Sequence, residues 1–164
     1  MGRREVIYRS NEDKTDEQAH AYVQTHQAAH RYLAYRDIPL LLQQFAHGKR
    51  ALDYGAGTGA SSVFLSDLGF DVIGVDVSSG MLEKAQTNFP DIQFCSVENL
   101  TAANDFDVVF SSFVLFELDK KDNIVQYLNK SSSFLKENGI ASINVFTFYA
   151  CYRNISSINR KGDA

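Results

Sequence analysis

Residues 51–60 read ALDYGAGTGA, and Asp76 follows 21 residues after the first glycine of this stretch. Apolar residues lead into three glycines in five positions, and a segment with helical character comes next. This order predicts a strand, a tight turn and the start of a helix, because glycines let backbone N–H groups approach a ligand closely. Asp76 closes the next apolar run, residues 71–76, where an acid can accept hydrogen bonds from a ribose. The stretch therefore predicts a nucleoside-binding site.

Two kinds of nucleoside site fit these glycines. Gly55, Gly57 and Ala60 fit the dinucleotide fingerprint G-x-G-x-x-G/A. Together with Asp53 and Gly59 the same stretch reads D-x-G-x-G-x-G, which resembles motif I of the class I S-adenosylmethionine (SAM) methyltransferases. Asp53 favours the second interpretation, because dinucleotide folds usually carry an apolar residue at this position. A carboxylate there can face the cleft and hold a cationic group of a ligand.

Three further segments resemble the same family. Residues 76–85, DVSSGMLEKA, carry an acid, a serine, Met-Leu and an alanine at the family's spacing. Residues 106–115, FDVVFSSFVL, are similar to motif IV, and residues 134–140, FLKENGI, resemble the turn before the fifth strand. Each motif alone is a weak signal, but four of them occur in the family's order between about residues 49 and 146.

The alternation of patterns predicts an α/β fold. Strands are expected at residues 51–54, 71–76, 92–96, 106–111 and 140–147, with helices at 60–68, 79–88 and 122–136. Strands separated by helices predict a parallel sheet with right-handed crossovers. The resemblance implies a three-layer, Rossmann-like sandwich with a mainly parallel, twisted sheet and helices on both faces. Gly139 is predicted to end the last helix.

The chain is predicted to have two parts. Residues 1–48 are expected to form a polar arm and a helical cap, with one helix from Asp16 and another from about Arg36 to Phe45. Pro39 suits a first turn, which favours a start of this second helix close to Ile38. Residues 49–164 are expected to form the SAM-binding domain.

The end of the chain departs from the family pattern. The resemblance implies seven strands, the last two added antiparallel beside strand five. Only about 17 residues follow Thr147, and they do not show two strand patterns, so the domain is predicted to be incomplete. Residues 140–146 contain no charged residue or proline that would protect an exposed edge. We expect self-association as a homodimer through this edge, low solubility, or an ordered tail from Phe148 that folds across it.

The resemblance also implies the residues that bind the cofactor SAM. Asp53 would approach its methionine ammonium, Asp76 its ribose, and Val77 and Met81 its adenine. A cap on the following helix is the structural alternative for Asp76, and ordinary core packing is the alternative for Val77 and Met81. The full predicted set is Asp53, Gly55, Ala56, Gly57, Asp76, Val77, Met81, Ser96, Val97 and Ser111.

Ser96 and the missing histidine are departures from the family. Ser96 stands where the family commonly has an aspartate that binds the adenine amino group, and a hydroxyl accepts that bond more weakly. Small-molecule members often carry a histidine near Phe116, but all four histidines here precede the glycine loop. The catalytic residues are therefore unknown, although methyl transfer needs chiefly proximity and alignment. No metal site is predicted, because a helical pair such as His26 and His30 usually forms a polar face.

The composition and charge of the chain argue against some classes of binding partner. A net charge of −4 and a pI of about 5.5 give no general attraction to nucleic acid. The N-terminus lacks a signal peptide, and the longest apolar run, residues 108–118, is too short to span a bilayer. We therefore expect a cytoplasmic protein without membrane or nucleic-acid partners.

The sequence thus predicts a SAM-dependent methyltransferase that acts on a small-molecule acceptor. Two alternatives stay open: a catalytically inert SAM-binding or dimerisation module, and an NAD-dependent oxidoreductase.

Overall fold

A computed structural model describes residues 35–100, 104–145 and 148–153 of the chain. Its contacts divide the chain into two compact units, Met1–Arg36 and Asp37–Ala164. All helices and strands discussed below belong to the second unit, so the helix at residues 38–45 lies in the same unit as the sheet. The predicted division at residues 48 and 49 stays a prediction, and the predicted helix from Asp16 lies outside the described residues.

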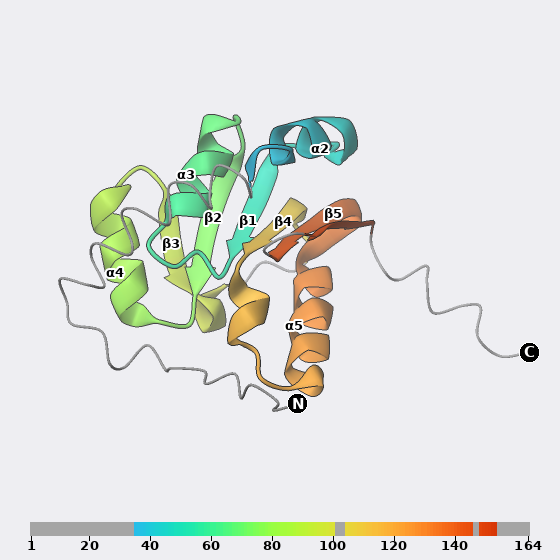
Figure 1. The fold of residues 1–164 in the computed structure, drawn as a ribbon. Helices are drawn as coiled ribbons and strands as arrows, with labels where there is room; N and C mark the ends of the chain where they lie inside the picture. The colour runs from blue at the N-terminus through green and yellow to red at the C-terminus, as the bar shows by residue number, and fades with distance from the viewer. Residues whose placement is uncertain (1–34, 101–103, 146–147, 154–164) are drawn as a thin grey trace, which may run out of the picture. The chain divides into compact units, whose positions relative to one another are not determined.

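Strands and helices alternate along this unit (Figure 1). In chain order they are α2 (Ile38–Phe45), β1 (Arg50–Tyr54), α3 (Ala60–Asp67), β2 (Asp71–Asp76), α4 (Ser79–Asn88), β3 (Gln93–Ser96), η2 (Val97–Asn99), β4 (Phe106–Ser112), η3 (Val114–Glu117), α5 (Lys121–Phe134), β5 (Leu135–Val145) and β6 (Phe148–Arg153). Across the described ranges, none of the helices combines the length and apolar character needed to cross a membrane.

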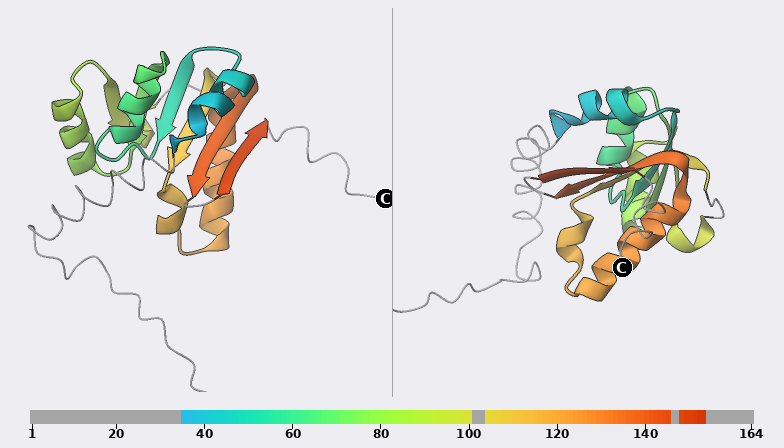
Figure 2. Two further views of the ribbon diagram at one scale, coloured as in Figure 1. Left: turned by 45° about the horizontal axis from the view of Figure 1, so that its top comes forward. Right: turned by 90° about the vertical axis from the view of Figure 1, so that its right-hand side faces the viewer.

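The strands form one sheet in the order β3-β2-β1-β4-β5-β6. β1 to β5 are parallel, and β6 is antiparallel to β5. From β1 the chain adds β2 and then β3 on one side of β1. It then returns to add β4 and β5 on the other side. Right-handed crossovers in opposite directions place α3 and α4 on one face and α5 on the other. Figure 2 shows α3 and α5 on opposite sides of the sheet. The predicted Rossmann-like α/β fold is confirmed.

The middle strands carry the core. Leu52, Val75, Val108 and Val109 are fully buried, as expected of parallel strands with both faces covered. The cluster around β1, β4 and β5 also includes Phe134, which comes from α5. This packing fixes the middle strands relative to one another, so the loops at their carboxyl ends begin from a rigid edge.

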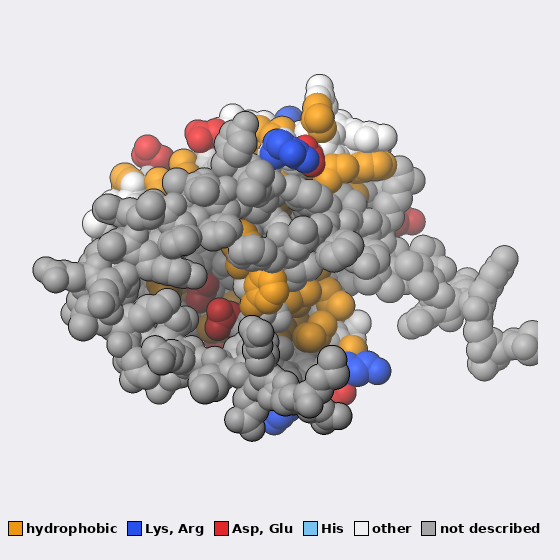
Figure 3. All heavy atoms as spheres, in the orientation of Figure 1, with side chains coloured by type: hydrophobic (Ala, Val, Ile, Leu, Met, Phe, Trp, Pro, Cys, Tyr) orange, Lys and Arg blue, Asp and Glu red, His pale blue; other side chains and the backbone are white. Residues whose placement is uncertain are grey.

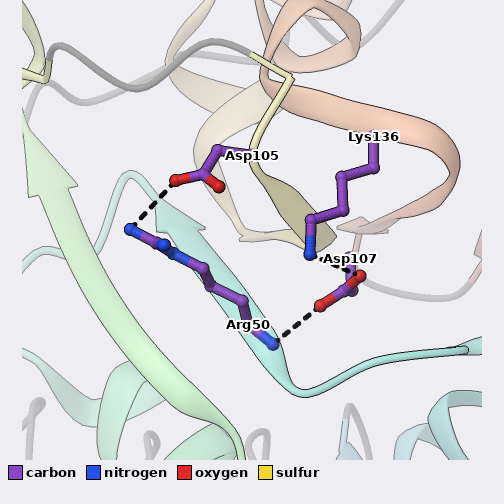
Figure 4. Close-up of polar contacts among 4 residues, drawn as sticks. All are labelled: Arg50, Asp105, Asp107 and Lys136. Atoms are coloured by element: carbon purple, nitrogen blue, oxygen red, sulfur yellow. Dashed lines mark hydrogen bonds and ion pairs between the residues drawn. The ribbon is translucent and has the colours of Figure 1, made fainter.

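An ion-pair cluster joins the beginnings of β1, β4 and β5 (Figure 4). The Arg50 guanidinium lies 3.0 Å from the Asp105 carboxylate, and Lys136 Nζ lies 3.0 Å from Asp107 Oδ1. The Arg50 backbone N–H also donates to Asp107 Oδ2 over 3.0 Å. Burial raises the pKa of Asp107, but the hydrogen bonds from Arg50 and Lys136 and their charges outweigh it, so this pKa lies below its ordinary value.

The predicted role of Gly139 is wrong. The helix ends at Phe134, and Gly139 lies within β5. The chain becomes extended at Leu135 because this buried residue pairs with Phe106 on β4, ahead of a register shift. A Cβ at Gly139 would lie 2.9 Å from the Phe106 carbonyl oxygen. The glycine is therefore needed for the close approach of β4 and β5, not for a helix cap.

The predicted free edge of strand five is also wrong. β6 pairs with β5 from Phe148 opposite Val145 to Arg153 opposite Ile140. Antiparallel neighbours need only a short connection, so one strand fits in the few residues after β5. Of the three expected outcomes, the ordered tail from Phe148 is confirmed. The reason for a homodimer through residues 140–146 is lost, because the backbone groups of β5 already have partners.

Candidate functional site

The candidate site lies where the sheet order changes direction. β1 has β2 on one side and β4 on the other, and all three end at the same edge. In α/β sheets such a switch point opens a crevice outside the carboxyl ends of the strands, where ligands bind. Figure 3 shows acidic and hydrophobic side chains next to each other over this region of Figure 1.

The three glycines after β1 have different roles. Gly55, Gly57 and Gly59 all have positive φ angles, of 88°, 53° and 88°. A Cβ at Gly55 would collide with the side chain of Val114 on η3, and one at Gly59 would lie 2.7 Å from the Phe89 ring. A Cβ at Gly57 meets nothing within 4 Å. Gly55 and Gly59 are therefore required by the protein's own packing, and Gly57 is the one with free space beside it.

Asp76 holds the glycine loop at the end of β2. Its Oδ2 accepts a hydrogen bond from the Gly57 N–H over 2.8 Å, and its Oδ1 accepts one from the Ser78 N–H over 2.9 Å. The cap of α4 is Ser78, whose hydroxyl accepts from the Met81 N–H. The structural alternative that made Asp76 this cap is therefore wrong. An ionised carboxylate has about four acceptor positions, and the described contacts occupy one on each Asp76 oxygen.

Asp53 is a fully buried carboxylate at the end of β1, with an exposed fraction of 0%. Its Oδ2 accepts from the hydroxyls of Ser61 and Ser62, over 2.7 and 2.6 Å. Its Oδ1 is also buried and has no hydrogen-bond partner in the described part of the chain. Burial raises the pKa of Asp53 to about 6, with a smaller contribution from the charge of Asp76, while the two serine hydrogen bonds lower it.

The Asp53 carboxylate is therefore an anion of the protein itself, placed at the N-terminus of α3. Ser61 and Ser62 belong to the first turn of α3, where backbone N–H groups and the helix dipole favour negative charge. In a dinucleotide site this position receives a pyrophosphate. Here the Asp53 carboxylate is bound to that turn through the two serine hydroxyls, so its negative charge disfavours a second anion there.

Tyr127 connects α5 to the ends of β1 and β4. Its ring stacks on that of Tyr54, with centroids 4.5 Å apart and an interplanar angle of 6°. The Tyr127 hydroxyl donates to the Tyr54 carbonyl over 2.7 Å, and Ser111 Oγ lies 2.7 Å from the same hydroxyl. Because Tyr127 has one hydroxyl proton, Ser111 is the donor in the second bond. Burial raises the pKa of Tyr127, which keeps the donor protonated.

The residues predicted to surround an adenine ring lie at the ends of β2 and β3. Val77 is 82% exposed and Met81 is 42% exposed, so ordinary core packing does not explain either residue. Ser96 pairs with Asp76 in the register of β2 and β3, which brings the two predicted ligands side by side. Val97 instead packs against the core.

The remaining predicted residues, Ala56 and Ser111, are both buried near the carboxyl ends of the strands. Ala56 is buried, and the Gly55 and Ala56 N–H groups both donate to the Val75 carbonyl. Ser111 is buried and bound to Tyr127, as described above. The bonds to Val75 anchor the loop to β2, and the bond of Ser111 joins β4 to α5.

The segment after β4 supplies no evident general base. Phe116 on η3 is 58% exposed, and Glu117 beside it is exposed. His26 and His30 lie outside the described residues.

Sequence reasoning missed Ser61, Ser62 and Tyr127. The two serines had a local signal, because two hydroxyl residues directly follow the glycine loop and begin α3. Tyr127 lies on the same helical stripe as Ile124 and Phe134, but its partner Tyr54 is 73 residues away. A contact of that kind is not visible in a local pattern.

Comparisons with known proteins agree with this geometry. The family model described as "Methyltransferase domain" matches residues 51–139, more than half of the chain. A demethylmenaquinone methyltransferase of Renibacterium salmoninarum is 44% identical over 71 residues, which are 42% of this chain and 30% of that protein. The chain spans less than half the length of the curated relatives that it matches.

Solved structures share the fold. The PH0226 protein of Pyrococcus horikoshii has a TM-score of 0.62 and 24% identity, over 74% of this chain and 55% of its own. A SAM-dependent methyltransferase of Clostridium acetobutylicum has a TM-score of 0.60 and 23% identity, over 78% of this chain and 56% of its own.

Proposed function

Because this chain belongs to the methyltransferase domain family, we propose that it binds SAM as its cofactor and transfers a methyl group to a small-molecule acceptor. The observation that carries this proposal is the Asp76 carboxylate. It fixes Gly57 and Ser78 with one acceptor position on each oxygen and keeps a second position on each. The two hydroxyls of a ribose can donate to one carboxylate in this way.

Asp53 supports SAM over a dinucleotide. SAM carries a positively charged ammonium group and sulfonium, whereas NAD carries an anionic diphosphate. A buried carboxylate with one free oxygen at the N-terminus of α3 attracts the first and repels the second. The residues present therefore fit SAM, with Asp53 toward its ammonium and Asp76 toward its ribose.

The glycine loop and the end of β3 complete the proposed site. Gly57 has free space on its Cα, so the cofactor can lie against the loop backbone there. The exposed side chains of Val77 and Met81 offer apolar surface to an adenine ring, and Ser96 offers a hydroxyl beside it. Ala56 contributes by anchoring the loop, Ser111 by its bond to Tyr127, and Val97 by its backbone at the beginning of η2.

Bound SAM would supply an electrophilic methyl group on sulfur. The protein's contribution is to fix the ribose and the ammonium, so that the sulfonium is held still in front of an acceptor. Phe116 gives the segment after β4 an exposed aromatic ring near the same sheet edge, which suits an acceptor with an apolar ring.

Calorimetric titration with SAM, S-adenosylhomocysteine and NAD tests the cofactor. We expect saturable binding of the first two and none of NAD. Saturable binding of NAD without binding of SAM would refute the proposal. Release of S-adenosylhomocysteine in the presence of candidate acceptors tests the transfer. The acceptor panel includes demethylmenaquinone, which the names of several relatives contain. Binding without turnover on any acceptor would instead indicate an inert SAM-binding module.

A further inference from the structure

The buried contacts of Asp53 point to a role for the two serines of α3. Ser61 and Ser62 are both buried, and both direct their hydroxyls at the same carboxylate oxygen, Oδ2. This leaves Oδ1 as the oxygen without a partner in the described part of the chain. Neither of the ion pairs found among the described residues involves Asp53. Among the described residues, the carboxylate therefore has two neutral donors and no cation beside it.

We propose that Ser61 and Ser62 are positioning residues for the cofactor, which hold Asp53 ionised and leave its Oδ1 to receive the ammonium group of SAM. This inference rests on the proposed function. Two hydroxyl donors on one oxygen stabilise the charged form of a buried carboxylate and fix its rotation. Without them, burial would favour the neutral acid, which offers an ammonium group far less attraction.

The two serines are the main groups that favour the ionised form of Asp53. Within the described ranges, the titratable groups that interact with it are Asp76 on β2, whose charge opposes ionisation, and Tyr127 on α5. Burial is the largest effect and also opposes ionisation, so the serine hydroxyls act against both. Gly74, which pairs with Asp53 across β1 and β2, leaves room for this arrangement, because a Cβ there would lie 2.9 Å from Ser62 Oγ.

The pH dependence of binding separates this role from a merely structural one. In the wild-type protein the affinity for SAM and for S-adenosylhomocysteine should weaken below about pH 6, where Asp53 takes up a proton. Loss of one serine hydroxyl should raise the midpoint by roughly one pH unit, since a hydrogen bond to a charged group is worth about that much. The loss of affinity in Ser62→Ala should then be about four times larger at pH 6 than at pH 7.5.

Three variants serve as controls. Ser66→Ala removes an exposed hydroxyl from the same helix, and Ser131→Ala removes a buried one whose partner is a helix carbonyl. Neither should move the midpoint. Ser61→Thr keeps a hydroxyl and should retain the wild-type pH dependence. Thermal unfolding confirms that each variant is folded before binding is measured.

A second measurement does not depend on the ligand. The Asp53 carboxyl carbon can be titrated by NMR in the ligand-free protein, and its midpoint should rise in Ser61→Ala and Ser62→Ala. Unchanged midpoints, or a loss of affinity by the same factor at every pH, would overturn the inference while the proposed function stands. A wild-type protein that binds neither SAM nor S-adenosylhomocysteine would refute the proposed function itself. The NMR titration would still show whether the serines hold the charge.

Discussion

Replacing Asp53 with asparagine should remove a pH dependence of stability that one buried carboxylate causes. Burial raises the pKa of Asp53 from 3.8 to about 6. The folded protein therefore keeps this proton to a higher pH than the unfolded chain does. Stability from this group is greatest below the unfolded pKa and falls as the pH rises through the folded pKa.

The size of the effect follows from the two pKa values. A shift of this size corresponds to roughly 3 kcal/mol over the full range, because one pKa unit is worth about 1.4 kcal/mol. About half of it should appear between pH 5 and 7.5. Asparagine has nearly the same shape, and its amide oxygen can still accept from Ser61 and Ser62, but it carries no charge.

Urea unfolding of the wild type and Asp53→Asn at pH 5, 6 and 7.5 measures the effect. The difference in free energy of unfolding, variant minus wild type, should grow by about 1.4 kcal/mol between the lowest and the highest pH. Asp67→Asn, an exposed aspartate at the end of α3, is the control for the chemical change. A difference that is constant with pH would show that Asp53 is already ionised without cost, and would refute the reasoning. Asp53→Asn should also lose most of its affinity for SAM.

Four further predictions concern the ends of the strands. Asp76→Ala should weaken SAM binding at least tenfold in calorimetry while the protein stays folded, because two loop N–H groups and the ribose lose their acceptor; an unchanged Kd would remove this residue from the site. Tyr127→Phe keeps the ring stack but loses both hydroxyl contacts, so its free energy of unfolding in urea should fall by about 1–2 kcal/mol. An unfolding midpoint equal to that of the wild type would show that these two hydrogen bonds do not stabilise the fold. Gly55→Ala should destabilise the protein more than Gly57→Ala, because only the first places a Cβ against a neighbouring side chain. Gly57→Val should nevertheless abolish SAM binding. The opposite order of stabilities would contradict the packing described. Lys136→Met should cost roughly 0.5–1 kcal/mol at pH 7, and the cost should disappear as the pH falls through the lowered pKa of its carboxylate partner; a cost that persists at low pH would show another cause.

Local signals in the sequence were enough to predict most of the sheet. The structure has β2 and α4 at the predicted residues, because glycine, proline and an apolar run mark the ends of each element. The same local reasoning failed at Gly139, where an Asn-Gly pair looks like the end of a helix. Pairing of Leu135 with Phe106 ends the helix earlier, and such long-range pairing overrides a cap signal.

β6 was predicted only as one of three outcomes for the edge of strand five. Residues 148–153, FYACYR, are rich in aromatic residues that favour strands, but the family pattern has two strands there, and the described residues after β5 form one.

The two carboxylates of the candidate site were predictable from the sequence, whereas the residues that hold them in place were not. Asp53 and Asp76 stand at fixed distances from the glycines, so their position at the strand ends followed from the motif. That Asp53 turns one oxygen to α3 and keeps the other free depends on how the helix packs on β1. The motif also does not distinguish the three glycines from one another. In the structure, a Cβ at Gly55 or Gly59 would meet a neighbouring side chain, whereas one at Gly57 would meet nothing within 4 Å.

The ion-pair cluster of Arg50, Asp105, Asp107 and Lys136 lies at the strand beginnings, and the glycine loop follows the opposite end of β1. The two groups share no side-chain partner in the described contacts. Substitutions at the two ends should therefore combine additively, with coupling energies near zero in a double-mutant cycle. For protein engineering, thermostability could then be adjusted at one end of the sheet without altering ligand affinity at the other.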